Sequence, residues 1–400
     1  MKKVISFSLM LMVGLVLSQM LPAQLGESYA ELKHLIEFML GVCLAFIMIN
    51  VGREFEIDKS SVKIYVKDYF VAMLAAALPW LFIAIYYILA LMPMEWWSSG
   101  EVWKETLLLS RFAAPTSAGI LFSMLAAMNL QRSWIYQKAQ TLAIFDDLDT
   151  IILMVPLQVA MIGELNWQMI AMLTIIFGLF FVGWRYMSCF KLRQTWYAIF
   201  TYAVLVYGAT LLVYTLTNHF FGEKGAIHIE VLLPAFIFGM MLKNRHVGGR
   251  EEERVTTAIS LVFMLLVGMS MPLIDMSGAQ PADNTESMIA TIPIMSGWEI
   301  ALHVIVVTIL SNLGKLAPML FYNDRSLIER LALSVGMFTR GEVGAGVIFI
   351  AIGYNIGGPI LLISVLTLVL NLILTIGFVY IVKKLALRAD RQRKVSRSRS

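Results

Sequence analysis

The sequence predicts an all-α polytopic membrane protein with about twelve transmembrane helices, and three observations support this fold class. The 400 residues are 59% apolar and 14% charged, with a mean hydropathy of +0.77. Ordinary soluble domains are roughly 45–50% apolar and about 25% charged. Apolar runs of about 20 residues, the length that crosses a bilayer as a helix, recur along the whole chain. Basic residues gather on one side of these runs, as membrane topology requires.

The apolar runs place the helices in order along the chain. The longest polar stretch between them is the outer loop at 275–297, which leaves no room for a soluble domain, so residues 1–400 form one integral membrane domain. The first run follows Lys2 and Lys3 and also fits a cleaved signal peptide, whose removal would leave eleven helices. The twelve expected helices are at 4–21, 35–52, 66–91, 106–128, 140–162, 167–186, 196–217, 227–243, 255–274, 298–321, 329–352 and 358–382.

The distribution of charge gives the orientation of the chain. Of the 31 basic residues, 25 fall in segments that are cytoplasmic if the amino terminus is inside, three fall in outer loops, and Arg111, Lys315 and Arg340 fall inside helices. This positive-inside bias predicts that both termini are cytoplasmic, as in a multi-pass protein of a bacterial inner membrane. The net charge of +4 therefore reflects topology and not nucleic-acid binding. The basic tail at 383–400 is expected to contact anionic membrane lipid or to be disordered.

The fifth apolar run contains adjacent acids, Asp146 and Asp147, at membrane depth. An acidic side chain at the centre of a membrane helix costs at least ~2.5 kcal/mol on insertion scales and marks a functional site by default. Two adjacent acids cannot both be ionised cheaply there, so a proton or a cation must be held nearby. Thr150 shares a helix face with both acids and is a candidate cation ligand. Asp149 is a third ligand, the partner of a basic residue, or a hydrogen-bonding residue between helices.

Helix-breaking clusters interrupt the fourth and eleventh runs. The first cluster contains Pro115 within Arg111–Gly119, and the second is the glycine-rich segment Gly336–Gly346. Proline removes a backbone donor and clashes with the preceding turn, and glycine weakens a helix. Each break lies in the second helix of a triplet, and the two triplets run in opposite directions across the membrane. This layout predicts an inverted-topology repeat with two crossed broken helices, whose freed carbonyls and helix ends would hold a cation at mid-membrane.

Lys315 is the expected counter-ion of one aspartate. By residue count it lies about as deep from the cytoplasmic side as Asp146, which is roughly six residues, or ~9 Å, into the membrane. The alternative is that its side chain snorkels to the inner headgroups. At the second break, Arg340 and Glu342 are expected to pair with each other or with the acids, or else to form a purely structural ion-pair network.

These features together resemble the monovalent cation:proton antiporters, the sodium/proton exchanger-like superfamily. The resemblance covers about residues 35–382, and it depends on the order of five short elements rather than on any single one. In chain order these are Ile49–Asp58, Ala114-Pro115-Thr116, Phe145-Asp146-Asp147, Gly314-Lys315 and Arg340-Gly341-Glu342-Val343-Gly344. The chain departs from the family pattern in its short amino-terminal region and in the additional acid, Asp149.

The resemblance implies a homodimer in which a core domain (about 66–162 and 298–382) moves against a dimerisation or scaffold domain (about 1–60 and 196–275). It implies that Asp147 binds Na⁺ and protons alternately, that Asp146 pairs with Lys315, and that two acids make exchange electrogenic. The full candidate site comprises Asp147, Asp146, Thr150, Thr116 and Asp149 as cation or proton ligands, and Pro115, Arg340, Gly341 and Glu342 in the broken-helix network. The additional Asp149 leaves open which two of the three acids form the working pair.

The function expected is therefore secondary active exchange of protons for monovalent cations, most simply Na⁺, without a cofactor and without enzymatic chemistry. A K⁺/H⁺ antiporter and a sodium-coupled organic-anion symporter are the alternatives among transporters. An intramembrane aspartyl protease would need its two acids on separate helices facing a shared water, which the adjacent Asp146 and Asp147 do not provide. A cation channel with an acidic constriction is a further class, against which the paired breaks argue.

Overall fold

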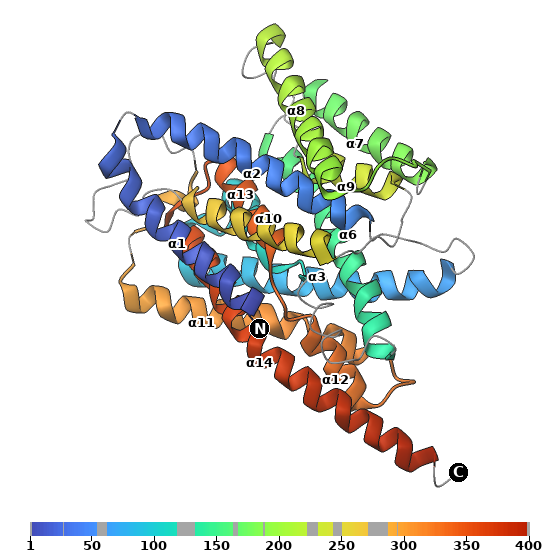
Figure 1. Ribbon diagram of the computed structural model, residues 1–400. Coiled ribbons are helices and arrows are strands. Elements are labelled where there is room, and N and C mark those ends of the chain that lie inside the picture. The colour runs from blue at the N-terminus through green and yellow to red at the C-terminus, as the bar shows by residue number, and fades with distance from the viewer. Residues whose placement is uncertain are drawn as a thin grey trace. The chain divides into compact units, whose positions relative to one another are not determined.

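The structure is a computed structural model that describes residues 2–26, 28–53, 62–117, 133–162, 167–186, 189–221, 231–242, 250–270, 287–293 and 295–397. Within these ranges the chain is almost wholly helical, and an isolated bridge between Phe190 and Leu242 is the only β-type pairing. The all-α fold class is therefore confirmed (Figure 1). Residues 54–58 of the first family-like element, the loop at 275–286 and the part of the fourth expected helix at 118–128 lie outside the described residues.

The described helices correspond in order to the expected runs. Five segments are long and apolar enough to cross a membrane, namely Tyr29–Arg53, Val66–Leu91, Trp196–Phe220, Gly297–Leu320 and Gly358–Thr375. The count of twelve stays a prediction. The α-helices are α1 (Lys2–Leu25), α2 (Ser28–Arg53), α3 (Val62–Leu91), α4 (Gly100–Ser110), α6 (Trp134–Ile162), α7 (Trp167–Arg185), α8 (Trp196–Phe221), α9 (Leu232–Met241), α10 (Arg250–Met269), α11 (Gly297–Gly314), α12 (Leu327–Gly336), α13 (Glu342–Gly353) and α14 (Gly358–Arg397). Short 3₁₀ turns are η2 (Met94–Trp96), η3 (Arg111–Ala113), η5 (Ile289–Thr291) and η6 (Ala317–Leu320).

The chain divides into two compact units. Unit 1 comprises Met1–Leu9, Lys59–Leu157 and Pro272–Ser400, and unit 2 comprises Met10–Asp58 and Gln158–Met271. Unit 1 contains α3, α4, most of α6 and α11 to α14, and it contains every candidate site residue. That unit 1 is a moving core and unit 2 a dimerisation scaffold stays a prediction.

In unit 2, α1 packs tightly against α10 through two glycines. A Cβ atom built on Gly14 would lie 2.1 Å from the Leu265 carbonyl oxygen, and one built on Gly268 would lie 2.4 Å from that of Leu11. Small residues of this kind let helix backbones approach closely in a membrane, where packing replaces the hydrophobic effect between helices. The first run is thus a helix that packs against α10. Its retention as the first membrane helix stays a prediction.

In unit 1, Asp68 ties the beginning of α6, and Tyr322 just beyond η6, to α3. Lys138 Nζ lies 2.7 Å from Asp68 Oδ2, and the Tyr322 hydroxyl donates to Asp68 Oδ1 at 2.8 Å. Burial and the Asp68 carboxylate raise the pKa of the Tyr322 hydroxyl well above its usual range, so it remains a neutral donor. These bonds fix, at one end, the two segments that carry Asp146 and Lys315.

The expected tenth helix, 298–321, ends earlier than the apolar run. α11 stops at Gly314, and Lys315 is the first residue beyond it, followed by η6. Pro318 explains the end, because a proline ring clashes with the carbonyl four residues before it, here that of Gly314. Lys315 is therefore at a helix terminus and not inside a helix as expected.

The last helix is longer than its apolar run. The expected end is at residue 382, whereas α14 continues without interruption to Arg397 (Figure 1). No glycine or proline follows Gly377, and the segment is rich in Ala, Leu, Lys and Arg, which favour helix. The expectation of a disordered tail is wrong for residues 383–397, and contact with anionic lipid stays a prediction.

Candidate functional site

The candidate acids lie on one turn of α6 and are removed from solvent. Asp146, Asp147, Asp149 and Thr150 are each at most 1% exposed. The Thr150 hydroxyl donates to the Asp146 carbonyl oxygen at 2.8 Å, as threonine often does inside a helix. This bond fixes the hydroxyl proton and leaves the oxygen lone pairs able to accept a hydrogen bond or to coordinate a cation.

Lys315 forms a buried ion pair with Asp146. Its Nζ lies 2.6 Å from Asp146 Oδ2, and both side chains are fully buried. Snorkelling to the headgroups is therefore wrong as an account of Lys315. The other carboxylate oxygen of this aspartate, Oδ1, accepts no hydrogen bond from any described residue. A buried acceptor without a donor is costly unless a proton, a water or a cation satisfies it.

The two helix breaks contact each other. After η3, residues 114–117 leave the helix, and the second break is the non-helical segment between Gly336 and Glu342. The backbone N–H of Ser117 donates to the Thr339 carbonyl oxygen at 3.0 Å, and the Thr116 hydroxyl donates to that of Met337 at 3.2 Å. These bonds satisfy backbone groups that a continuous helix would satisfy internally. The break expected at Gly341 is observed between α12 and α13, and the helix before Pro115 ends as expected. Residues 118–132 lie outside the described residues, and the crossing of two full broken helices stays a prediction.

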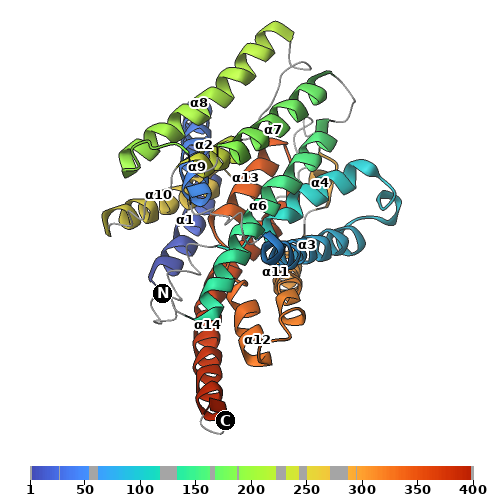
Figure 2. The same cartoon turned by 90° about the vertical axis from the view of Figure 1, so that its right-hand side faces the viewer.

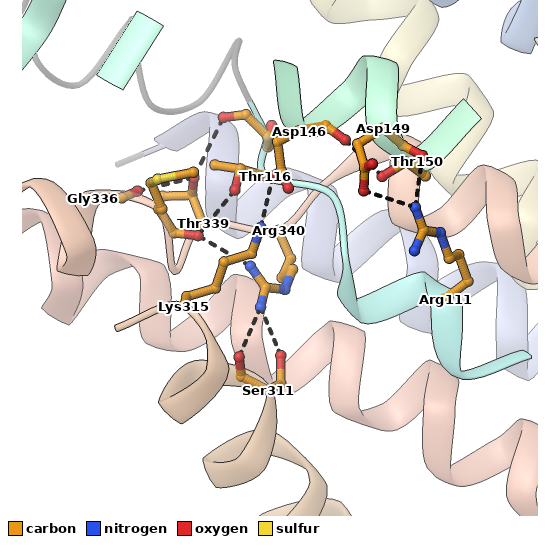
Figure 3. A network of polar contacts seen from close by, with 12 residues as sticks. Arg111, Thr116, Asp146, Asp149, Thr150, Ser311, Lys315, Gly336, Thr339 and Arg340 are labelled. Atoms are coloured by element: carbon orange, nitrogen blue, oxygen red, sulfur yellow. Dashed lines mark hydrogen bonds and ion pairs between the residues drawn. The ribbon is translucent and has the colours of Figure 1, made fainter. Parts of the chain in front are cut away.

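Arg340, in the second break, binds neutral acceptors. Its Nη2 donates to the Ser311 hydroxyl at 2.7 Å and to the Ser311 carbonyl at 3.2 Å, and its Nη1 donates to the Met337 carbonyl at 3.1 Å (Figure 3). The expected pairing with Glu342 cannot be placed, since that side chain lies outside the described residues. Arg340 thus brings a fixed positive charge to the second break and ties it to α11.

Arg111 is the site residue that sequence reasoning missed. Its Nη2 lies 2.7 Å from the carbonyl oxygen of Asp149 and 3.2 Å from its Oδ2, and all of Arg111 is buried. A usable signal existed, because Arg111 is one of only three basic residues that the charge count leaves inside the expected helices, so it required an acidic partner at membrane depth. Of the three roles considered for Asp149, the observed contact is that of a partner to a basic residue, Arg111.

Close packing at Gly314 places Lys315. α3 and α11 lie side by side in both views (Figures 1 and 2), and a Cβ atom on Gly314 would lie 2.3 Å from the backbone nitrogen of Pro79. Pro79 has no N–H, so α3 presents no unpaired donor at this contact. The Lys315 side chain, at the end of α11, is thereby positioned to reach Asp146.

Substituting Gly314 with Ala should therefore destabilise unit 1 by about 1–3 kcal/mol, the usual cost of overpacking, and displace Lys315. Thermal unfolding of the detergent-solubilised protein measures this effect. Gly377→Ala is the matched control, because a Cβ at that helical glycine meets nothing within 4 Å. Equal unfolding temperatures for the two variants would contradict the packing account.

Comparison with known proteins identifies the family and the fold of this chain. The family profile described as "Sodium/hydrogen exchanger, transmembrane" matches residues 3–384. The fold is similar to that of the sodium proton antiporter MjNhaP1 from Methanocaldococcus jannaschii at pH 8, with a TM-score of 0.60 at 16% identity over 96% of this chain and 92% of that one. A second structure, from an electron-microscopy map of the same antiporter, has a TM-score of 0.53 at 14% identity, covering 94% and 90%.

A search of curated protein sequences gave no significant match. The family match covers nearly the whole chain and includes both breaks, the acids of α6 and Lys315. The protein is thus a multi-pass integral membrane protein of the sodium/hydrogen exchanger family, a family of transporters and not of enzymes.

Proposed function

We propose that this protein exchanges protons for Na⁺ across a membrane by alternating access, and that the exchange is electrogenic. The observation that carries the proposal is the fully buried ion pair between Lys315 and Asp146, one residue from Asp147 on α6. Buried charges of this kind inside a membrane protein mark ion pathways and proton relays. The sodium/hydrogen exchanger family supplies the reaction class.

In this proposal Asp147 is the residue that binds Na⁺ and a proton alternately. Adjacent positions on a helix differ by about 100°, so Asp147 points away from the side on which Asp146 meets Lys315. The oxygen atoms available around a cation are carboxylates, the Thr150 and Thr116 hydroxyls, and the carbonyls freed by the breaks. Such oxygens coordinate Na⁺ in transporters that have broken helices.

Competition between the two cations is sufficient to couple their movements. An ionised carboxylate surrounded by apolar helices binds whichever positive ion is available, a proton at low pH or Na⁺ at high concentration. Lys315 compensates Asp146 and so limits how strongly the site holds either ion. The occupied site can change its access side, whereas an empty, ionised site is hindered by the cost of moving a bare charge.

Further parts of the proposal concern assembly and location. We expect a homodimer formed through unit 2, in a bacterial inner membrane, with both termini cytoplasmic. Membrane lipid, the cation and protons are then the only partners that the exchange reaction needs.

Exchange by the purified protein in liposomes tests the proposal. A pH-sensitive dye is enclosed, a proton gradient is imposed, and Na⁺, Li⁺, K⁺ or choline is added outside. We expect Na⁺ and Li⁺ to collapse the gradient and choline to leave it intact, and we expect the rate to change when valinomycin and K⁺ set the membrane potential. Activity with K⁺ alone would replace the Na⁺ assignment, a rate independent of potential would contradict electrogenicity, and a requirement for an organic anion would indicate symport.

A further inference from the structure

We propose that Arg111 and Asp149 form a fixed ion pair that holds α6 against the first helix break, so that Asp149 is a positioning residue and not a cation ligand. This inference rests on the proposed function for its transport consequences. It assigns a role to the acid and the base that the exchange mechanism above leaves unused.

The contact between Arg111 and α6 has two parts. Nη2 of Arg111 reaches both the side-chain Oδ2 of Asp149, at 3.2 Å, and the backbone carbonyl of the same residue, at 2.7 Å (Figure 3). The shorter bond is to the backbone, so Arg111 holds the helix itself as well as the carboxylate. Both side chains are buried, which protects the pair from water and salt.

Trp80 of α3 completes the arrangement. The Arg111 guanidinium lies over the Trp80 ring at 4.5 Å from its centroid, and the Trp80 indole N–H donates to the Leu107 carbonyl of α4 at 2.7 Å. A planar guanidinium can stack flat on an aromatic face while the N–H groups in its plane donate to a carboxylate and to a carbonyl. Arg111 thereby joins α3, the first break and α6, which are the three members of the first triplet.

The second triplet contains a comparable contact. Arg340 lies in the second break and donates to Ser311 of α11, within its own triplet. Each break therefore carries one buried arginine that binds a neighbouring helix of the same triplet. The partner of Arg340, Ser311, is neutral, so the contact between them holds two segments together without an ion pair. By this correspondence we infer that Arg111 also acts by holding segments in place.

Helix geometry separates Asp149 from Asp147. Two residues along a helix correspond to about 200°, so these carboxylates leave α6 on nearly opposite sides. A cation bound by Asp147 through its side chain is therefore out of reach of Asp149. In contrast, Thr116 lies five residues after Arg111 in the same break, so the ion pair sets the position of a candidate ligand relative to Asp147.

A double-mutant cycle tests the pair with Arg111→Met, Asp149→Leu and the double variant. Each single change leaves one buried charge without its partner, whereas the double change replaces both with apolar side chains of similar size. We expect each single change to lower the unfolding temperature by roughly 5–10 °C and the exchange rate by roughly tenfold. The double variant should recover to within about threefold of the native rate, with the apparent KM for Na⁺ within about threefold of native in every variant.

The solvent-accessible ion pair between Lys104 and Glu101 on α4, 2.7 Å long, provides the control. Its cycle of Lys104→Met and Glu101→Leu should show almost no coupling, since exposed pairs contribute little to stability. Stabilisation of the solubilised protein by added Na⁺ gives a readout independent of turnover, and it should persist in Asp149→Leu.

Loss of Na⁺-dependent stabilisation in Asp149→Leu, together with a KM raised tenfold or more and no recovery in the double variant, would show that Asp149 is a ligand and overturn the inference. Additive unfolding temperatures in the cycle would overturn it as well. The unfolding measurements do not require transport, so they decide the role of the pair even if native protein fails to exchange Na⁺ and the proposed function is wrong.

Discussion

Replacing Asp147 with Asn is expected to abolish Na⁺-driven proton movement while the protein still folds. The amide keeps the shape of the side chain but cannot carry the charge or the exchangeable proton on which competition depends. Loss of one charged contact to a bound ion costs about 3 kcal/mol, so affinity for Na⁺ should fall roughly 100-fold or more. Dye-reported exchange in liposomes measures the rate, and unfolding with and without Na⁺ measures residual binding.

Asp324→Asn is the matched control for Asp147→Asn. Its side chain is 66% exposed and lies beyond η6, outside the site, so the same chemical change there should leave exchange at the native rate. Native exchange in Asp147→Asn would remove this residue from the transport mechanism. Attention would then shift to Asp146, the other acid of the adjacent pair.

The second large effect is expected at the ion pair between Lys315 and Asp146. Lys315→Met leaves the Asp146 carboxylate buried without its cation, and breaking a buried pair in this way typically costs about 3–5 kcal/mol. We expect a lower unfolding temperature and loss of exchange in Lys315→Met. The double variant Lys315→Met/Asp146→Asn should unfold at a temperature above that of Lys315→Met, because no uncompensated charge remains.

Tryptophan fluorescence during heating follows unfolding in this series, since the chain contains nine tryptophans. The solvent-accessible pair between Arg325 and Asp324, 3.2 Å apart, is the control, and Asp324→Asn, at the exposed member of the pair, should change the unfolding temperature little. If the double variant were less stable than both single variants, Lys315 and Asp146 would each contribute through other neighbours and not through their mutual contact.

Much of the fold follows from the sequence because the bilayer imposes simple rules on it. Length and apolar composition mark the helices, and proline and glycine mark the breaks at Pro115 and Gly341. The acids of α6 stand out because charge is expensive at membrane depth. Helix ends are less predictable, since the run at 298–321 stays mostly apolar beyond Gly314, and Pro318 accounts for the end of α11 at Gly314.

The partner of each charge was predictable only where depth alone selected it. Lys315 matches Asp146 in depth, and the structure brings the two together at 2.6 Å. Arg111 matches several acids equally well by residue count, and its choice of Asp149 depends on how the first break turns beside α3 and α6. A hydrogen bond requires a position within about 3 Å, whereas residue counting locates a side chain only to about one helical turn.

The sequence by itself determined that this is a helical membrane protein with costly acids in one helix and with helix-breaking residues at two places. Composition and spacing are local properties, so they can be determined from the amino-acid sequence alone. Only the tertiary structure decided that the two breaks bond to each other through Thr116 and Ser117, and that Arg340 rests on Ser311. Those contacts join segments more than 200 residues apart in the first case, and no local pattern encodes which surfaces meet.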